Sequence, residues 1–279
     1  MKNRKRITRL CLELFAAALL GFFLWWNNAA LVVSETVIPA PIEGKIRLVQ
    51  LSDVHGAWFG RGQARIAAKV RGIQPDVIVI TGDLIDRFHD DDAAYALIRE
   101  MAKIAPSYIV TGNHEKLEEN EADGSYDRQL KVIEETETAY LLRGETVELM
   151  PDVTLTGADD VSFAGGLGGY PEYLKGLSGQ AGADFSILLA HRPEMMERYA
   201  AAGFSLILSG HAHGGQIRLP FIGGLYAPGQ GARPEYTSGL YEIGEGSMMY
   251  VNRGLGNSVF PFRLFNRPEI AVLTITGEK

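Results

Sequence analysis

The stretch Ile46–His55, "IRLVQLSDVH", decides the fold class because it runs from a strand directly into a polar turn. Its first six residues are mostly apolar and too few for a helix, which is typical of a buried strand. The turn that follows supplies a carboxylate, Asp53, and an imidazole, His55. A strand that presents such side chains at its carboxyl end is typical of ligand-binding α/β proteins.

The same arrangement, an apolar run followed by polar side chains, occurs four more times along the chain. The further strand-like runs cover residues 76–80, 107–110, 185–190 and 204–208. Helix-compatible segments alternate with these runs, at residues 62–73, 91–104, 125–137 and 193–202. This alternation predicts an α/β fold with buried central strands. The later residues 236–254 and 262–276 predict β-hairpins and strands with few helices.

The polar residues after the five runs are expected to form one site, because the carboxyl ends of parallel strands meet at one edge of a sheet. Five of the six histidines fall in these turns, and His89 is the exception. Taken singly, such residues could instead cap helices or hold turns. The candidate site residues are Asp53, His55, Asp83, Asn113, His114, His191, His211 and His213.

These residue types predict a metal site without sulfur ligands. The single cysteine, Cys11, lies in the N-terminal apolar segment, so a thiolate zinc cluster and an internal disulfide are excluded. Carboxylate, imidazole and amide groups suit Mn²⁺, Fe²⁺ or Zn²⁺ better than Ca²⁺, which prefers oxygen ligands alone. The candidates are too many for one ion. With one shared carboxylate they would hold two divalent metal ions about 3.5–4 Å apart, as in two-metal phosphoryl displacement.

The N-terminal segment Ile7–Trp26, "ITRLCLELFAAALLGFFLWW", predicts a membrane-spanning helix. At about 1.5 Å per residue it would reach about 30 Å, the thickness of the hydrocarbon core of a bilayer. We expect residues 1–33 to be an uncleaved anchor, and the alternatives are a cleaved signal peptide and a buried helix. Basic residues before the segment stay on the cytosolic side, so a single-pass cell-membrane protein with its main domain outside the cytoplasm is expected.

The rest of the chain divides into a linker and one domain. Residues 34–45, "SETVIPAPIEGK", contain two prolines and no helical period, and they predict a linker. Residues 46–279 are expected to form the globular domain. The net charge of −7 disfavours a body that binds nucleic acid through a basic surface.

The blocks "DVH", "GDLID", "GNHE", a single histidine and "GHAH", in this order over residues 53–213, resemble the calcineurin-like metallophosphoesterases. The resemblance implies a sandwich of two mixed β-sheets flanked by helices, and hydrolysis of a phosphoester bond. The segments "GHAHGGQIRLP" and "NRGLG…FPFRLFNRPEI" are similar to a membrane-anchored bacterial branch. That branch includes UDP-2,3-diacylglucosamine pyrophosphatases and cell-wall-associated phosphoesterases, and it implies a phosphorylated, lipid-linked substrate.

The resemblance also implies a role for each residue of the site. The expected ligands of one metal are Asp53, His55 and His213. The expected ligands of the other metal are Asn113, His191 and His211. Asp83 would bridge the two, and His114 would face the scissile phosphate, stabilising charge or protonating the leaving oxygen. Asp86 and Arg192 are expected to support the ligands, and Glu115 stands where the family often has aspartate.

The sequence thus predicts a metal-dependent hydrolase of a phosphodiester or diphosphate bond in a membrane- or lipid-linked substrate. The alternative is a membrane-tethered binding or sensing protein that keeps the metal site without turnover. The pair Trp58-Phe59 is expected to form an exposed apolar lip beside the site. A nucleotide-linked lipid belongs to the cytosolic leaflet, whereas the basic N-terminus places the domain outside, and we follow the charge rule for the topology and keep that substrate as one candidate. The sequence leaves the oligomeric state and the native metals open.

Overall fold

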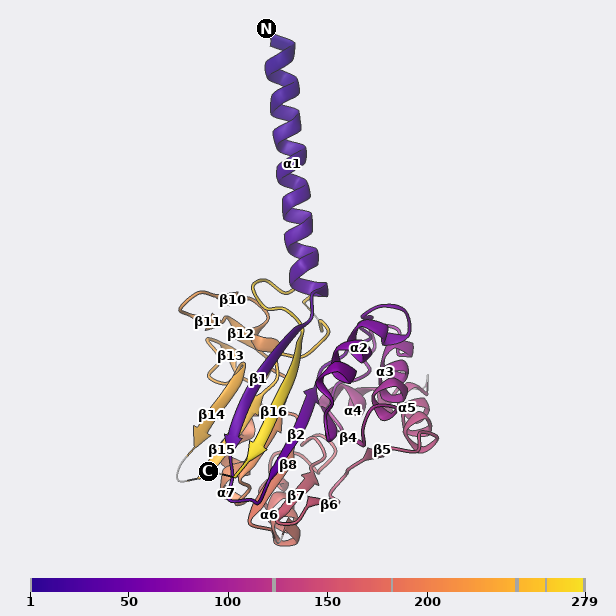
Figure 1. Cartoon of the computed structure of the whole chain (residues 1–279), viewed down its shortest axis with the longest axis vertical. Helices are drawn as coiled ribbons and strands as arrows, with labels where there is room; N and C mark the ends of the chain where they lie inside the picture. The colour runs from indigo at the N-terminus through magenta and orange to yellow at the C-terminus, as the bar shows by residue number, and fades with distance from the viewer. Residues whose placement is uncertain (1, 122–123, 182, 244–245, 259, 278–279) are drawn as a thin grey trace.

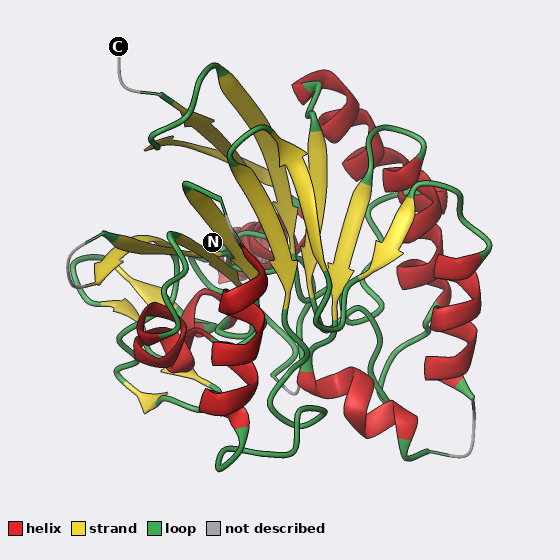
Figure 2. Cartoon of the chain, turned by 90° about the horizontal axis from the view of Figure 1, so that it is seen from below, coloured by secondary structure: helices red, strands yellow, loops and turns green. Residues whose placement is uncertain are grey.

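Two six-stranded mixed β-sheets packed face to face make up the body of the protein in the computed structural model (Figures 1 and 2). The structure describes residues 2–121, 124–181, 183–243, 246–258 and 260–277. Helices lie beside the sheets, and a long N-terminal helix projects from one end of the molecule (Figure 1). The expected sandwich of two mixed sheets flanked by helices is confirmed.

The first sheet has the strand order β1-β16-β2-β3-β4-β5. Its strands are β1 (Val32–Pro39), β16 (Glu269–Thr276), β2 (Lys45–Leu51), β3 (Val77–Thr81), β4 (Ser107–Val110) and β5 (Ala139–Leu141). The strands β2 to β5 run parallel, so their carboxyl ends point the same way. β16 is antiparallel to β2 and parallel to β1.

The second sheet has the strand order β14-β15-β9-β8-β7-β6. Its strands are β14 (Gly239–Ile243), β15 (Ser247–Val251), β9 (Leu206–Ser209), β8 (Phe185–Leu189), β7 (Val153–Gly157) and β6 (Thr146–Met150). The central strands β7, β8, β9 and β15 run parallel. The two edge strands, β6 and β14, pair in the antiparallel sense.

The apolar core lies in three layers, one between the sheets and one outside each sheet. Between the sheets, Leu48 and Val79 meet Leu155 and Ile187, all fully buried. The helices on the first sheet are α2 (Ala64–Ile73), α3 (Asp92–Ala102) and α5 (Ser125–Glu134). The helices on the second sheet are α6 (Tyr170–Ala181) and α7 (Met196–Ala201). Because the central strands are covered on both faces, they read as continuous apolar runs in the sequence.

Short elements complete the fold. The helix α4 (Asn113–Glu119) lies beside α5. Single 3₁₀ turns cover Arg61–Gln63, Pro193–Met195 and His213–Gly215. The small hairpins are β10 (Arg218–Leu219) with β11 (Gly223–Gly224), and β12 (Tyr226–Ala227) with β13 (Gly231–Ala232). The strands β10 to β12 lie toward the end of the domain from which the N-terminal helix emerges (Figure 1).

The strands and helices expected from the sequence are confirmed, with small differences at their ends. The runs at residues 76–80 and 204–208 are β3 and β9, and the segment 91–104 is α3. The sequence analysis does not predict β5, β6, β7 or α6. The strand β5 has three residues, and β6 is half exposed, so neither shows a clear apolar pattern. The helix α6 contains a proline and two glycines, which disfavour helices.

The expected linker, residues 34–45, is a strand over much of its length. β1 pairs with β16 in parallel from Val32 to Pro39, and Ile38 is buried between the sheets. Its β-branched residues favour this edge strand, and a proline is tolerated at its end. The domain therefore begins with β1, and two residues separate this strand from the N-terminal helix.

The N-terminal helix, α1 (Lys2–Ala29), is largely free of the domain (Figure 1). Its segment Arg4–Ala29 contains an 18-residue stretch with a mean hydropathy of 1.9, and the helix is long and apolar enough to cross a membrane. Its last turns contact the C-terminal segment: the rings of Phe23 and Phe265 lie 5.2 Å apart, centroid to centroid. The direction of α1 is therefore set by contacts with the domain as well as by β1.

Candidate metal centre

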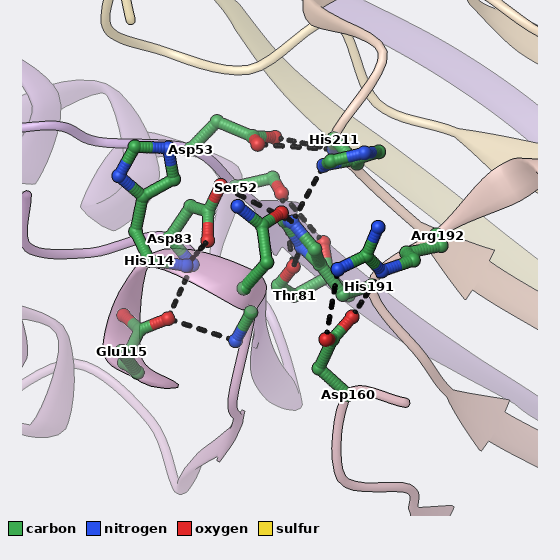
Figure 3. Close-up of polar contacts among 12 residues, drawn as sticks. Ser52, Asp53, Thr81, Asp83, His114, Glu115, Asp160, His191, Arg192 and His211 are labelled. Carbon is green, nitrogen blue, oxygen red and sulfur yellow. Dashed lines mark hydrogen bonds and ion pairs between the residues drawn. The ribbon is translucent and has the colours of Figure 1, made fainter. Parts of the chain in front are cut away.

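The turns after β2, β3, β4, β8 and β9 meet at one edge of the two sheets. The eight candidate residues lie in these turns or, for Asn113 and His114, at the start of α4, and hydrogen bonds or ring contacts connect them. Figure 3 shows how side chains from turns far apart in the sequence point toward one another. Their atoms form two neighbouring groups, and the carboxylate of Asp83 lies near histidines of both.

The first group contains the side chains that follow β2 and the second histidine of "GHAH". Nε2 of His55 lies 3.2 Å from Nε2 of His213. Nε2 of His213 lies 3.7 Å from Oδ1 of Asp53. One ligand atom from each residue lies within 4.8 Å of the others, and all three residues are buried. This group could hold one metal ion.

The second group comes from the turns after β3, β4, β8 and β9. Nδ1 of His211 lies 3.0 Å from Nε2 of His191. Nε2 of His191 lies 3.2 Å from Oδ1 of Asn113 and 3.2 Å from Oδ2 of Asp83. Ligand atoms of Asp83, His191 and His211 lie within 4.8 Å of one another, so this group could hold a second ion.

Asp83 lies between the two groups. Its Oδ2 is 3.2 Å from Nε2 of His191 in the second group and 3.6 Å from Nε2 of His55 in the first. Its Oδ1 accepts a hydrogen bond from the backbone N–H of His114 at 2.9 Å. The carboxylate is therefore held by the backbone on one side and faces both groups with the other.

The chemistry of the donors fits divalent cations. In each group two imidazole nitrogens face each other, although at most one of each pair can donate a proton to the other. Burial lowers the pKa of His211 and His213 well below the usual range, so both rings stay neutral, the form that binds metals. Burial also disfavours charge on His191, but the Asp83 carboxylate outweighs it and raises the pKa of His191 to about 10. The negative charge of Asp83, which stabilises the protonated form of His191, would also stabilise a metal cation at this site.

Five of the candidate ligands have left-handed backbone conformations. The φ angles are 50° at Asp53, 43° at His55, 53° at Asp83, 62° at His211 and 47° at His213. Such conformations cost about 1–3 kcal/mol each for residues other than glycine. The surrounding fold must therefore hold these turns in place, and strain concentrated at one point is typical of a functional site.

Two glycines allow the turns to approach so closely. A Cβ added at Gly112 would lie 2.1 Å from Oδ1 of Asp83. A Cβ added at Gly210 would lie 1.8 Å from Oγ of Ser52 and 2.4 Å from Oδ2 of Asp53. Neither position has room for a side chain, so packing requires the glycine that begins each of the blocks "GNHE" and "GHAH".

His55 is oriented by Asp86. Nδ1 of His55 lies 2.9 Å from Oδ2 of Asp86, which leaves Nε2 of the ring facing the first group. Burial raises the pKa of Asp86, but hydrogen bonds from His55, from the backbone N–H of Phe88 and from His89 outweigh it and lower the pKa to about 2. The sequence identifies Asp86 as a supporting residue but does not place His89, which contacts the same carboxylate.

Arg192, the other expected supporting residue, pairs with Asp160. Nε and Nη2 of Arg192 lie 2.6 Å and 3.0 Å from the two carboxylate oxygens (Figure 3). Asp160 is not among the candidates from the sequence. The pattern that could have identified it is "VTLTGADD", the strand β7 followed by two carboxylates.

Glu115 connects the turn after β3 to the turn after β4. Its carboxylate accepts hydrogen bonds from the backbone N–H groups of Asp83 at 3.0 Å, Leu84 at 2.7 Å and Gly112 at 2.8 Å. Burial and then the charge of Asp83 raise the pKa of Glu115 to about 7, and hydrogen bonds from Gly112 and Leu84 oppose the rise. The longer glutamate in place of the family's aspartate thus reaches across to the backbone of the shared ligand.

Arg263 is a fully buried residue of the site that the sequence does not predict. Its Nη2 lies 3.4 Å from Nδ1 of His213, on the side of the ring away from the first group. Its Nη1 donates to the backbone oxygen of Arg253 at 2.8 Å, and its Nε donates to that of Gly256 at 3.2 Å. It lies in the segment "FPFRLFNRPEI", in which no local pattern distinguishes it from the other basic residues.

His114 lies beside the first group. Its ring centroid is 4.7 Å from that of His55, with an interplanar angle of 86°. Burial lowers the pKa of His114, and its Nδ1 has no hydrogen-bond partner among the described residues. One of its nitrogens is also within 4.8 Å of ligand atoms of His55 and Asp86. The Asp86 carboxylate already accepts hydrogen bonds from His55, Phe88 and His89, so it is occupied as a partner of protein groups. His114 is therefore not counted with the two metal groups.

Of the two residues expected to form the exposed apolar lip, one is exposed and the other is buried. The side chain of Trp58 is 46% exposed, whereas that of Phe59 is 2% exposed. Phe59 packs in the core between the first sheet and its helices, and its N–H donates to Oε1 of Gln63 at 2.9 Å. The lip prediction is therefore wrong for Phe59, because the turn directs its ring into the helical layer.

Comparisons with known proteins agree with this geometry. A family model described as calcineurin-like phosphoesterase matches residues 46–215. The chain is 32% identical to YkuE of Bacillus subtilis, named an uncharacterized metallophosphoesterase, over 87% of this chain and 83% of that protein. It is 30% identical to phosphodiesterase YaeI of Escherichia coli over 82% of each chain. It is also 32% identical to a transmembrane protein with a metallophosphoesterase domain of Danio rerio, over 85% of this chain and 54% of that protein.

Proposed function

This chain belongs to the calcineurin-like phosphoesterase family and is a phosphoester hydrolase, and we propose that it cleaves a phosphodiester or diphosphate bond in a membrane- or lipid-linked substrate. One combination carries the proposal: two groups of metal-binding side chains in a domain joined by two residues to a helix long enough to cross a membrane. Two residues reach at most about 7 Å. The domain is therefore held at the bilayer, where a lipid-linked phosphate lies.

The seven metal-binding positions divide between the two ions according to their groups. The proposed ligands of the first ion are Asp53, His55 and His213. The proposed ligands of the second ion are Asn113, His191 and His211. Asp83 is the proposed shared ligand, because its Oδ2 faces both groups. Divalent ions such as Mn²⁺, Fe²⁺ or Zn²⁺ supply Lewis acidity toward phosphoryl oxygens and lower the pKa of water.

His114 is the proposed catalytic residue. Its ring stands beside His55, its Nδ1 is free of protein partners among the described residues, and burial keeps the imidazole neutral by lowering its pKa. A neutral imidazole has one N–H, which can donate to an oxygen of the scissile phosphate or to the leaving oxygen. The backbone N–H of the same residue binds Asp83, so the position of His114 is tied to the shared carboxylate.

Two features support the substrate class and the position of the domain. A relative named a phosphodiesterase supports the diester, and the apolar helix α1, which is long enough to cross a membrane, supports a lipid-linked compound. We propose α1 as the membrane anchor and the part of the chain from β1 onward as the catalytic domain. The basic residues that precede the apolar helix favour a catalytic domain outside the cytoplasm.

The test is a metal-dependent activity screen of the full-length protein in lipid nanodiscs. Metal-free protein is loaded with Mn²⁺, Fe²⁺ or Zn²⁺ and given bis-p-nitrophenyl phosphate, p-nitrophenyl phosphate and a lipid-linked diphosphate. We expect the diester and the lipid-linked diphosphate to be hydrolysed faster than the monoester. Preference for the monoester would refute the bond class, and absence of turnover on all three with two ions bound would favour the binding or sensing protein.

A further inference from the structure

An apolar cavity of about 520 Å³ lies directly beside the proposed metal centre. His213 forms part of one wall, and the other walls come mainly from Ile217, Leu225, Pro228 and Phe260. A cavity of this size is large enough for a small ligand or part of a larger one. Its mostly apolar walls suit hydrocarbon better than a sugar or a nucleotide, whose polar groups would lose their hydrogen bonds to water.

The hairpin that continues from this cavity places two large apolar side chains in water. Phe221 and Ile222 connect β10 to β11, and Phe221 is fully exposed while Ile222 is 65% exposed. The φ angle of Phe221 is 67°, a left-handed conformation that a bulky side chain rarely adopts. The tip therefore combines a strained backbone with an exposed aromatic ring, and both features are typical of a binding surface.

The hairpin that carries the exposed tip begins and ends at the cavity, because Ile217 precedes β10 and Leu225 follows β11. Tyr226 and Phe260 both line the cavity, and both are exposed. Gln216 also lines the cavity, and its side-chain amide donates to the backbone oxygen of Phe260 at 3.0 Å. The hairpin is therefore attached at both ends to the cavity that His213 lines.

This surface lies at the end of the domain from which α1 emerges (Figure 1). The position of α1 relative to the surface is set by specific contacts. Oδ1 of Asn28 accepts hydrogen bonds from the backbone N–H of Arg263 at 2.8 Å and from Nδ2 of Asn257 at 3.1 Å. The guanidinium of Arg267 lies 5.4 Å from the ring of Trp26. A bilayer that contains α1 would thus meet the hairpin on the same side of the domain.

We propose that the tip formed by Phe221 and Ile222 inserts into the bilayer surface and that the cavity beside His213 receives a hydrocarbon chain of the substrate from that bilayer. This inference rests on the proposed function and adds to it a location for the lipid part of the substrate. The phosphate would lie at the two metal groups while its chain runs along Leu225 and Phe260. Hydrolysis then selects substrates by their chain, because burial of each methylene group contributes to binding.

The first test compares p-nitrophenyl ethyl phosphate with p-nitrophenyl hexadecyl phosphate, which share the bond and the leaving group. The Mn²⁺-loaded full chain in nanodiscs should show a kcat/KM at least about tenfold higher for the hexadecyl ester, a ratio that fewer than two buried methylene groups can provide. The double variant Phe221→Ser/Ile222→Ser and the cavity-filling variant Ile217→Trp should lose most of this preference. The matched control is Tyr140→Ser, which removes an exposed aromatic ring from β5 and should keep the preference.

The outcomes separate this inference from the proposed function. Hydrolysis of both esters at equal kcat/KM by the wild-type protein would overturn the chain site and leave the phosphodiesterase intact. Loss of preference in the Tyr140→Ser control as well would also overturn it. Failure to hydrolyse either diester, with two ions bound, would overturn the proposed function and this inference together.

A second test needs no activity, and the single cysteine of the chain makes it simple. In a Cys11→Ser background, Phe221→Cys and Tyr140→Cys are each labelled with an environment-sensitive nitrobenzoxadiazole dye. In nanodiscs of phosphatidylethanolamine and phosphatidylglycerol, the emission of the dye at position 221 should lie at shorter wavelength than at position 140. It should also be quenched by spin-labelled lipids. Equal, water-like emission at both positions would overturn insertion of the tip.

Discussion

The guanidinium of Arg263 lies 3.4 Å from Nδ1 of His213, and both side chains are buried. Burial lowers the pKa of Arg263 to about 10, so the group stays protonated near neutral pH. The guanidinium can only donate, so Nδ1 of the neutral His213 ring accepts, and the ring proton lies on Nε2, which faces Asp53 and His55. Because the backbone N–H of Arg263 also binds Asn28 of α1, one residue connects the N-terminal helix to a proposed metal ligand.

The substitution Arg263→Lys should weaken the first metal site. Lysine keeps the charge but has one donor group, which cannot reach both the backbone oxygen of Arg253 and the ring of His213 as the guanidinium does. We expect a loss of about 10–100-fold in affinity for one of two ions, measured by titration of the metal-free protein with Mn²⁺. The matched control is Arg267→Lys, near the Trp26 ring. Equal affinities in both variants would refute the orienting role of Arg263.

Asp83→Asn should be the most damaging substitution among the proposed ligands. An amide has one weaker acceptor oxygen in place of a carboxylate that faces both groups, so both ions should bind poorly. His213→Ala should instead remove mainly the first ion, because the His213 ring belongs to the first group and not to the second. Elemental analysis after dialysis gives the number of ions per chain. Two ions and normal turnover in Asp83→Asn would show that this carboxylate is not shared.

His114→Ala should keep both ions and lose turnover. We propose no metal for its ring, which stands beside that of His55 and whose Nδ1 has no hydrogen-bond partner among the described residues. If it takes part in proton transfer, kcat should fall about 10²–10⁴-fold. A normal kcat with nitrophenolate as the leaving group and a reduced kcat with an alkoxide would indicate protonation of the leaving oxygen. Loss of an ion from the variant would instead make His114 a ligand.

Gly210→Ala should destabilise the folded protein, although it adds a single methyl group. Its Cβ would lie 1.8 Å from Oγ of Ser52, so the turn that carries both histidines of "GHAH" would have to move. We expect a loss of about 1–3 kcal/mol, the usual cost of overpacking a buried site, measured by urea unfolding of the detergent-solubilised protein.

The matched control is Gly72→Ala in α2, where an added Cβ meets no atom within 4 Å. Alanine in place of glycine in a helix should increase the free energy of unfolding by about 0.5–1 kcal/mol. Equal effects of the two substitutions would show that the close approach at Gly210 does not constrain the site.

Much of the fold follows from local patterns. The runs before Asp53, Asp83 and His191 are strands because each is a short apolar segment buried on both faces. The small edge strands β5 and β6 and the helix α6 lack such a pattern and become visible in the structure alone. The same is true of β1, whose strand character depends on pairing with β16, more than two hundred residues later in the chain.

The sequence by itself determined which residues could bind metal, because a ligand-bearing turn directly after a strand is a local feature and parallel strands place such turns at one edge. Tertiary structure alone decided how these residues divide into two groups, and which side chains orient them. Arg263 lies 50 residues from His213, and Asp160 lies 32 residues from Arg192, so no local pattern connects either pair. It also decided that Phe59 is buried and Phe221 is exposed, because the burial of a loop residue depends on which distant elements cover it.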